Sequence, residues 1–528
     1  MTGPASLDSE VPDPHRRAVG EGLISGTAWT AIHVIVSVPI AFLVNVLVAR
    51  TLGVVDYGQL AILTMVVALA TTAGSLGVGA ALMQFVTRAA ETGRRREVSG
   101  LVSGAQGYNI FLAAPVVALV VAIVVDVPWP YLLLALVFGI FGPALLQVGP
   151  ILLATEHRSD RAAQLAMASN VLIQLVVVAT VLLHPTAASV WAARVAATGA
   201  LMVLPFLALS PSLRRAALRP ARPWSLPRAF WVFAVPTGVA TLLSQLVTDR
   251  VQVFFLEWLG DPVGVGLFAL AFGLAAQVLA PVQAAVGPLL PAFAALRERG
   301  PDRARDGLLR VTHVAAVVAG AVLSLGIPVL AGLIPWIYGS GYAPSSDYFV
   351  LMACAAGLVV VGSGAYASLM ARLRGATYLY VNVAALAVMA GVAVTAIPSF
   401  GAWGAVASMV GGSSARALLM VALEARHHGI PAGELAASFA PIITATVTTL
   451  SVWFVLAERV PGPGWVTAAI GGVVSFGLFA VLLGLTRTGL APGDRDALLA
   501  VVPARARPLA DRGVRVVSRS RSREARRG

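Results

Sequence analysis

The sequence predicts an all-α polytopic membrane protein, and three observations support this fold class. Of the 528 residues, 58% are hydrophobic and only 12% are charged, whereas a soluble domain has about 25% charged residues. Apolar runs recur from Leu23 to Thr486, and crossing ~30 Å of hydrocarbon takes about 20 helical residues. The runs do not alternate between apolar and polar residues, so helices are expected rather than a membrane β-barrel.

Breaks at charged or Pro/Gly-rich segments divide these runs into about fourteen predicted transmembrane helices. The predicted ranges are 23–48, 58–85, 99–125, 131–155, 164–183, 187–209, 230–256, 264–293, 311–338, 348–371, 377–397, 402–424, 438–457 and 465–486. The first run is expected to be a transmembrane helix and not a signal peptide, because no small-residue cleavage site follows it.

The predicted organisation has six parts, with a central cavity between two pseudo-symmetric six-helix lobes. They are a disordered cytoplasmic N-terminal tail (1–22), an N-lobe (23–210), a basic cytoplasmic linker (211–229), a C-lobe (230–425), two additional C-terminal helices (438–486) and an Arg-rich cytoplasmic tail (487–528).

The placement of arginine predicts the direction of the helices. Every second connection is basic, and together these connections hold nineteen arginines: Arg88, Arg94, Arg95, Arg96, Arg158, Arg161, Arg214, Arg215, Arg219, Arg222, Arg228, Arg297, Arg299, Arg303, Arg305, Arg310, Arg372, Arg374 and Arg426. The intervening connections contain only Arg50 and Arg459. Because cytoplasmic loops carry the excess of basic residues, we predict a multi-pass protein of the cytoplasmic (inner) membrane with both termini in the cytoplasm.

Composition excludes several kinds of site. All 37 basic residues are arginine, and a phosphate-binding P-loop requires a lysine. Cys354 is the only cysteine, which rules out an intramolecular disulfide and a cysteine-based metal site. We therefore expect no cofactor and no metal ion, and uphill transport would draw on an ion gradient, the membrane potential or a partner.

The connections on the predicted outer side are all short, and none has more than one carboxylate. They are Ala49–Tyr57, Asp126–Pro130, His184–Thr186, Gly260–Val263, Gly339–Asp347, Ser399–Gly401 and Glu458–Gly464. Membrane glycosyltransferases and polymerases that use lipid-linked sugars usually place catalytic carboxylates and a sizeable loop or domain on that side. The sequence therefore favours a transporter over an enzyme.

The two halves of the chain share a weak internal repeat at a spacing of about 207 residues. The first predicted helix ends in Arg50-Thr-Leu-Gly53, and the seventh ends in Glu257-Trp-Leu-Gly260. A Leu/Ala-rich helix follows in both halves, which suggests two related lobes.

Several short motifs resemble one family over roughly residues 20–490. They are ARTLGVVDYG at 49–58, LGVGAA at 76–81, IYGSGY at 337–342, Asn382, and FGAWGAVA at 400–407. In this order they resemble the oligosaccharide flippases (Wzx-type) of the multidrug/oligosaccharidyl-lipid/polysaccharide exporter superfamily. The resemblance implies the two-lobed fold, polyprenyl-diphosphate-linked glycans as substrates, and transport by alternating access.

Polar residues within the seventh predicted helix are the first candidates for mechanism. A charge inside a membrane helix costs about 2.5–3.5 kcal/mol on insertion scales and usually faces a cavity or a partner. Arg250 is a candidate ligand for the diphosphate, because guanidinium bonds phosphate oxygens bidentately. Asp249 is a candidate ion-coupling group, and Gln245 a candidate sugar ligand. The alternative is that Asp249 and Arg250 form ion pairs with other helices and set the packing of the lobes.

Four further residues are weaker candidates. Arg416 in the twelfth predicted helix, and Arg50 and Asn45 in or near the first, are candidates for substrate binding; His33 is a candidate for ion coupling. Each also has a structural explanation, such as snorkelling to the headgroups or a hydrogen bond between helices.

Two other polar features are interpreted as structural. Arg194, near the outer end of the sixth predicted helix, is expected to snorkel to the outer surface. His427 and His428 lie in a cytoplasmic loop without a third metal ligand, so they are expected to be solvated.

The predicted partners follow from charge and from the resemblance. The Arg-rich tail is expected to bind anionic lipids of the inner leaflet, at about 1 kcal/mol per arginine near the surface. Nucleic acid is not expected, because the tail has no aromatic residues for stacking. The resemblance implies a lipid-linked glycan as substrate and polysaccharide polymerase or export machinery as protein partners.

Three alternatives to an oligosaccharide flippase stay open. A peptidoglycan-precursor flippase shares the fold and the substrate chemistry. A multidrug cation exporter needs buried carboxylates, yet the helix interiors hold three arginines (Arg194, Arg250 and Arg416) and one clear carboxylate, Asp249. A membrane glycosyltransferase or polymerase is the least favoured.

Overall fold

A computed structural model of the chain describes residues 14–156, 158–248, 251–284, 300–372, 375–457 and 464–490. It also describes single residues at 293, 296, 495, 507, 511 and 516–518. The named elements in these ranges are all helical, and thirteen helices are long and apolar enough to cross a membrane. The all-α polytopic fold predicted from the sequence is therefore confirmed, and the chain is a multi-pass membrane protein.

The first half of the chain contains α1 to α11. Their bounds are α1 Pro14–Ser75, α2 Val78–Glu91, α3 Arg95–Tyr108, η1 Asn109–Ala113, α4 Ala114–Val124, α5 Trp129–Leu134, η2 Ala135–Phe141, α6 Gly142–Leu146, α7 Val148–Thr155, α8 Ser159–Leu183, α9 Ala187–Leu201, α10 Val203–Leu207 and α11 Pro211–Ala217.

The second half contains the remaining elements. They are η3 Pro223–Ser225, α12 Arg228–Thr248, α13 Gln252–Trp258, α14 Pro262–Ala284, α16 Pro301–Tyr338, η4 Ser340–Tyr342, α17 Ser345–Val361, α18 Ser363–Ala371, α19 Gly375–Phe400, α20 Ala402–His427, α21 Ala432–Ala457 and α22 Gly464–Thr486.

Residues 49–57 were predicted to form a loop, and this prediction is wrong. Helical structure runs through these residues, and only Gly53 departs from helical angles, with φ 76° and ψ 177°. Glycine adopts a positive φ without steric penalty because it has no Cβ. The hydroxyl of Tyr57 donates to Oδ1 of Asn45 at 2.9 Å, although twelve residues of straight helix span about 18 Å. The two arms of α1 therefore fold back on each other at Gly53.

The end of the second predicted helix also differs from the prediction. The second arm of α1 stops at Ser75, and Leu76 (φ 41°) and Gly77 (φ 72°) interrupt the helix before α2 continues to Glu91. Val36–Ser75, the first of the thirteen candidate membrane spans, contains both arms. It therefore takes the place of two predicted helices.

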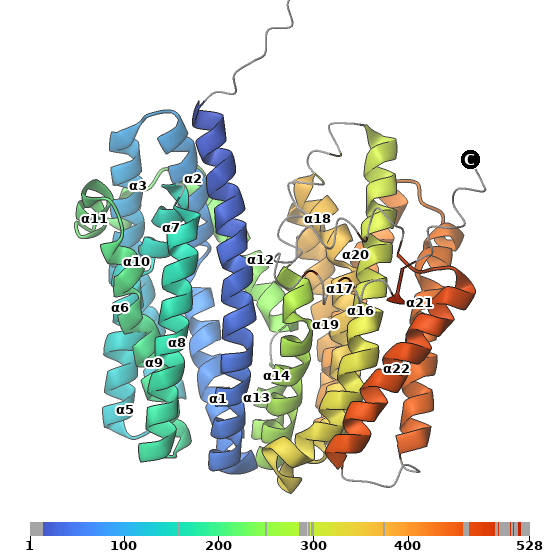
Figure 1. Cartoon of the computed structure of the whole chain (residues 1–528). Coiled ribbons are helices and arrows are strands. Elements are labelled where there is room, and N and C mark those ends of the chain that lie inside the picture. Colours follow the sequence, from blue (N-terminus) through green and yellow to red (C-terminus); the bar gives the residue numbers. More distant parts are fainter. Residues whose placement is uncertain are drawn as a thin grey trace, which may run out of the picture.

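The helices form two bundles, α1–α11 and α12–α22, which lie side by side and diverge toward one end (Figure 1). At the opposite end the bundles pack closely: a Cβ on Gly58 would lie 2.8 Å from the backbone nitrogen of Gly266. The hydroxyl of Tyr342 in η4 also donates to the carbonyl of Ala49 at 3.0 Å. The predicted boundaries between the lobes and the two additional helices stay predictions.

Helix α12 links the two bundles. Near its start, Phe230 and Ala234 are fully buried in a cluster with residues of α2 and α3. Farther along, Ser244 shares a hydrogen bond of 2.9 Å with the hydroxyl of Tyr378 in α19.

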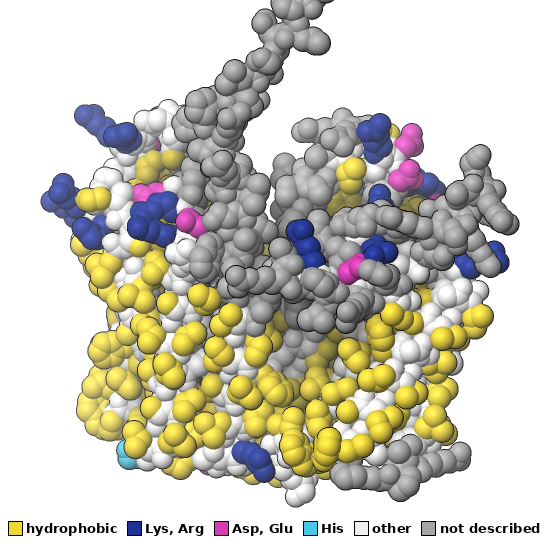
Figure 2. Space-filling model, viewed as in Figure 1, with side chains coloured by type: hydrophobic (Ala, Val, Ile, Leu, Met, Phe, Trp, Pro, Cys, Tyr) yellow, Lys and Arg dark blue, Asp and Glu magenta, His cyan; other side chains and the backbone are white. Residues whose placement is uncertain are grey.

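Charged side chains gather at one end of the molecule, and a broad apolar band covers the face below them (Figure 2). The helix ends there carry the described arginines of the basic connections, such as Arg94–Arg96, Arg214, Arg215 and Arg426. We call it the arginine-rich end, and the end that contains Arg50 and Gly53 the arginine-poor end.

Candidate functional site

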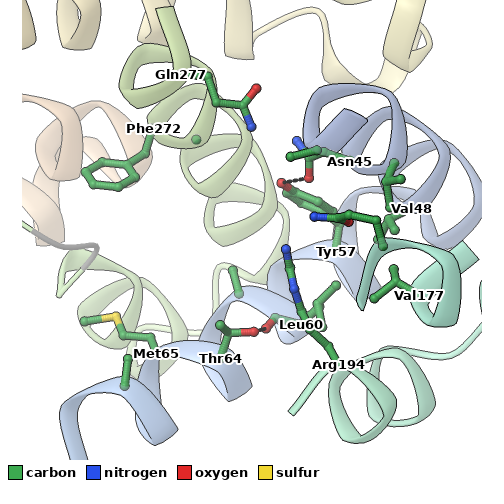
Figure 3. Close-up of a pocket in the computed structure, with 16 residues that line it drawn as sticks. Asn45, Val48, Tyr57, Leu60, Thr64, Met65, Val177, Arg194, Phe272 and Gln277 are labelled. Carbon is green, nitrogen blue, oxygen red and sulfur yellow. Dashed lines mark hydrogen bonds between the residues drawn. The ribbon is translucent and has the colours of Figure 1, made fainter. Parts of the chain in front are cut away.

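A central cavity of about 290 Å³ lies where α1, α8 and α9 of the first bundle meet α14 of the second (Figure 3). Its apolar lining includes Val48, Leu60, Met65 and Phe272. Its polar lining consists of Asn45, Tyr57, Thr64, Gln174, Arg194 and Gln277. The cavity is thus amphipathic and is built from four membrane helices.

The folded-back α1 supplies one wall of the cavity. Asn45 comes from its first arm and Tyr57 from its second, and their hydrogen bond ties the two arms together. The Thr64 hydroxyl donates to the carbonyl of Leu60, within its own helix, at 2.8 Å. The turn at Gly53 therefore brings Asn45 and Tyr57 to the same wall of the cavity.

Two glutamines contribute amide groups that the fold leaves partly unpaired. Gln174 is buried, and its amide nitrogen donates to Oδ1 of Asn170 at 3.3 Å within α8. Among the described residues, Oε1 of Gln174 and Oε1 of Gln277 have no hydrogen-bond partner. A buried acceptor without a partner costs about 1–3 kcal/mol. A ligand rich in hydroxyl groups would remove this cost.

Arg194 is exposed and lines the central cavity, and its expected reach to the outer surface stays a prediction. Trp191, one helical turn earlier in α9, is fully buried. Residues three apart lie close together along a helix, but Arg194 itself is exposed. Figure 3 shows the Arg194 side chain extending into the cavity beside Tyr57 and Leu60.

The described lining of the central cavity contains one charged side chain. Arg194 is the only charged residue among its described lining residues, which include no Asp, Glu or His. A guanidinium offers several donors to carboxylate or phosphate oxygens. The arrangement therefore suits an anionic ligand that also carries hydroxyl groups.

The structure separates the residues that the sequence suggested for the site. Asn45 lies in the central cavity. Arg50 is exposed beyond the cavity, at the arginine-poor end of the first arm of α1, and Gln245 is half-buried in α12 and is not among the lining residues. Arg416 lines a different cavity, in the second bundle.

Three predicted residues lie outside the described side chains. Asp249 and Arg250 lie outside the described residues. His33 belongs to α1, but its side chain is not among those described. Their proposed roles in ion coupling and diphosphate binding stay predictions.

Five residues of the central cavity were not predicted as site residues: Tyr57, Thr64, Gln174, Gln277 and Arg194. Their one sequence signal is polarity within an apolar run. Gln174 donates within its own helix, α8. Tyr57 was assigned to a loop.

A cluster at the arginine-rich end corrects the expectation that His428 is solvated. Glu424 is fully buried and forms an ion pair with Arg372. Ser368 donates to Oε2 of Glu424 at 2.7 Å and lies 3.2 Å from Nε2 of His428. Burial lowers the pKa of His428 from its usual value, against the opposing effect of the Glu424 carboxylate.

This cluster borders a third cavity of about 460 Å³. Its lining residues include Arg305, Arg372, His427 and His428. Arg305 also forms an ion pair with Glu434 of α21 at 2.5 Å. Among the described residues, no group of three or more His, Cys, Asp or Glu could hold a metal ion.

Comparison with known proteins places this geometry in context. A family model described as polysaccharide biosynthesis protein matches residues 23–297. No curated protein matches the sequence.

Solved structures share the fold at low sequence identity. An inward-facing multidrug resistance MATE family transporter of the MOP superfamily is 15% identical, with a TM-score of 0.59 over 76% of this chain and 98% of that chain. A mutant of the Vibrio cholerae MATE transporter VcmN is 16% identical, with a TM-score of 0.54 over 79% and 99%. A MOP superfamily transporter from Pyrococcus furiosus, described as having a binding pocket of reverse polarity that suggests a different function, is 15% identical, with a TM-score of 0.55 over 76% and 95%.

Proposed function

The chain belongs to the polysaccharide biosynthesis protein family, and from this premise we propose that it flips a polyprenyl-diphosphate-linked oligosaccharide across the inner membrane. The substrate moves from the cytoplasmic to the outer leaflet, where it enters the assembly of cell-surface polysaccharide. The arginine-rich end is the cytoplasmic side in this proposal, as the excess of basic residues in cytoplasmic loops predicts.

The chemistry of the central cavity carries the proposal. Arg194 offers a positive charge to a diphosphate, and Asn45, Gln174 and Gln277 offer amides to sugar hydroxyls. Charge-assisted bonds between guanidinium and phosphate are roughly twice as strong as neutral hydrogen bonds. A ligand with both groups would satisfy both sets of side chains.

The arrangement of the bundles suits alternating access. The bundles diverge at the arginine-rich end (Figure 1) and pack closely at the arginine-poor end, where Gly58 meets Gly266. This is the arrangement expected of a state open to the cytoplasm. Rocking of one bundle against the other would then expose the central cavity to the outer side.

A multidrug cation exporter is the second candidate. It is favoured by the fold, which this chain shares with MATE transporters. A cationic drug needs a carboxylate in the cavity, and the described lining has none. A peptidoglycan-precursor flippase has the same chemical requirements as the proposed one, so the identity of the glycan separates these two.

The test measures the lipid-linked oligosaccharide pool of each leaflet in cells that lack the protein. We expect complete oligosaccharide to accumulate on the cytoplasmic side and surface polymer to disappear, and the mass of the accumulated species identifies the glycan. Complementation with the wild-type chain should restore both. An unchanged pool, together with increased sensitivity to cationic drugs, would favour the exporter instead.

A further inference from the structure

A second cavity of about 300 Å³ lies within the second bundle, between α17, α18, α19 and α20. It shares no lining residue with the central cavity. Its polar lining is formed by Ser363, Tyr366, Tyr378 and Arg416, and the remaining lining is mostly apolar.

Arg416 is held at this cavity by a short chain of hydroxyl groups. Its Nη1 donates to Oγ of Ser244 in α12 at 3.3 Å. Ser244 in turn lies 2.9 Å from the hydroxyl of Tyr378. The guanidinium is thus fixed from the α12 side.

The charge of Arg416 lacks a carboxylate partner within the part of the chain that the structure describes. Within those residues its guanidinium donates to a neutral serine, and no described carboxylate forms an ion pair with it. Arg416 is half-buried, a guanidinium has five N–H donors, and a charge partly removed from water is costly unless it is paired and hydrogen-bonded. The unused donors therefore favour an oxyanion in the adjoining cavity.

Two aromatic rings complete the cavity. Tyr366 and Tyr378 have ring centroids 5.5 Å apart and are tilted by 59°. A phenol combines an apolar ring with a hydroxyl donor. These rings can hold the apolar and hydroxyl-bearing parts next to an oxyanion.

The two cavities lie at different depths in the membrane. Tyr378 is three residues from the start of α19 and Tyr366 five residues from the end of α18, both near the arginine-rich side. In the central cavity, Tyr57 is four residues from Gly53 and Arg194 is seven residues from the start of α9, both toward the arginine-poor side.

We propose that the second cavity is an oxyanion-binding site on the cytoplasmic side of the transport path, with Arg416 as its ligand-binding charge. A phosphate oxygen accepts from the free guanidinium donors before the substrate reaches Arg194. The place in the transport path rests on the proposed function, whereas the ligand chemistry rests on the cavity alone. Two sources carry such a group: the diphosphate of a polyprenyl lipid and the phosphate of an anionic bilayer lipid.

The experiment measures binding to the purified full chain by native mass spectrometry, with undecaprenyl diphosphate and with dioleoyl phosphatidylglycerol as separate probes. The variant is Arg416→Gln. The matched control is Arg426→Gln, which removes an exposed arginine ten residues along the same helix. We expect Arg416→Gln to weaken the binding of one probe about ten-fold or more, as expected for the loss of a bond to a charged group. The control should leave the binding of both probes unchanged.

The outcomes separate the two sources. Weaker binding of undecaprenyl diphosphate alone identifies the transported lipid as the ligand, and weaker binding of phosphatidylglycerol alone identifies a bilayer lipid. If Arg416→Gln binds both probes as tightly as Arg426→Gln does, the site does not exist.

A second measurement needs no variant. Phenylglyoxal modifies accessible arginines, and peptide mapping reports each position. Arg416 should react in the free protein and be protected by the bound probe. A lack of reaction, or a lack of protection by either probe, contradicts the proposal.

Failure of the proposed function gives a different result. In that case the wild-type chain does not bind undecaprenyl diphosphate, and the leaflet pools are the same in cells with and without it. Phosphatidylglycerol still protects Arg416 from phenylglyoxal. If Arg416→Gln keeps normal binding and transport, the second site is overturned and the flippase proposal stands.

Discussion

The hydroxyl of Tyr342 donates a hydrogen bond of 3.0 Å to the backbone carbonyl of Ala49, across 293 positions of sequence and between the two helical bundles. The rings of Tyr57 and Tyr342 lie edge to face, with centroids 6.2 Å apart. This contact closes the arginine-poor end, directly beyond the central cavity.

Tyr342→Phe should loosen this closure. It removes the hydroxyl and keeps the ring contact, so the loss is about 1 kcal/mol, or roughly a five-fold shift toward the state open at the arginine-poor end. Spin labels at Leu183 and Trp258, two exposed positions on different bundles, would report the distance between the bundles. The labels are placed in a Cys354→Ala background. An unchanged distance distribution would show that the hydrogen bond does not hold the two bundles together.

Gly58→Ala should force the bundles apart at the same end. The added Cβ would lie 2.8 Å from the backbone nitrogen of Gly266, and backbone cannot give way as a flexible side chain can. We expect a lower melting temperature and a loss of transport, since overpacking typically costs about 1–3 kcal/mol. Gly391→Ala in α19, where a Cβ meets open space, is the control and should behave as the wild type does.

Arg194→Gln should reduce transport at least about ten-fold, because it removes a charge-assisted bond to the substrate anion. The melting temperature should stay close to that of the wild type, and Arg194→Lys should recover part of the activity. Arg215→Gln, an exposed arginine in α11, is the control. Equal transport by Arg194→Gln and Arg215→Gln would remove Arg194 from the substrate site.

Glu424→Gln should destabilise the second bundle. It leaves Arg372 without its counter-charge, and breaking a buried pair costs about 3–5 kcal/mol; we expect the lower end of this range, because the Arg372 side chain is 15% exposed. The comparison is Glu97→Gln, whose exposed pair with Arg94 is worth about 0–1 kcal/mol. Thermal melting of both variants measures the difference, and similar melting temperatures would contradict the structural role of Glu424.

The pKa of His428 predicts a pH dependence of stability. Its folded pKa lies below the usual value, so the unfolded chain binds more protons near pH 6. Stability from this residue is therefore present above the unfolded pKa of about 6.5 and falls as pH drops toward the folded pKa. The melting temperature of His428→Gln should depend less on pH between 7.5 and 5.5 than that of the wild type. His427→Gln, which changes the exposed neighbour, should keep the pH dependence of the wild type.

The fold could be predicted from the sequence because it depends on long apolar runs, and those are visible residue by residue. Arginine placement likewise predicted which helix ends gather together, as Arg94 and Arg426 show. The predicted connection at residues 49–57 failed because polar residues such as Asp56 resemble a loop, while one glycine suffices to turn the chain.

The site was harder to predict because membrane helices give little information about their orientation. Arg194 was expected at the surface, and the structure shows in addition that its exposed side chain lines the central cavity. Asn45 was predicted from its polarity, but its partner Tyr57 depends on the fold of α1. Composition thus favours an anionic ligand, and tertiary packing decides which arginines line a cavity.

The turn at Gly53 also limits how the sequence can change in length. A loop between two helices usually accepts an inserted residue, but here the second arm of α1 begins directly after the glycine. One added residue would rotate every later side chain of that arm by about 100°. Tyr57 and Thr64 would then both turn away from the cavity. A single inserted residue at this turn would therefore remove two polar groups from the cavity wall at once.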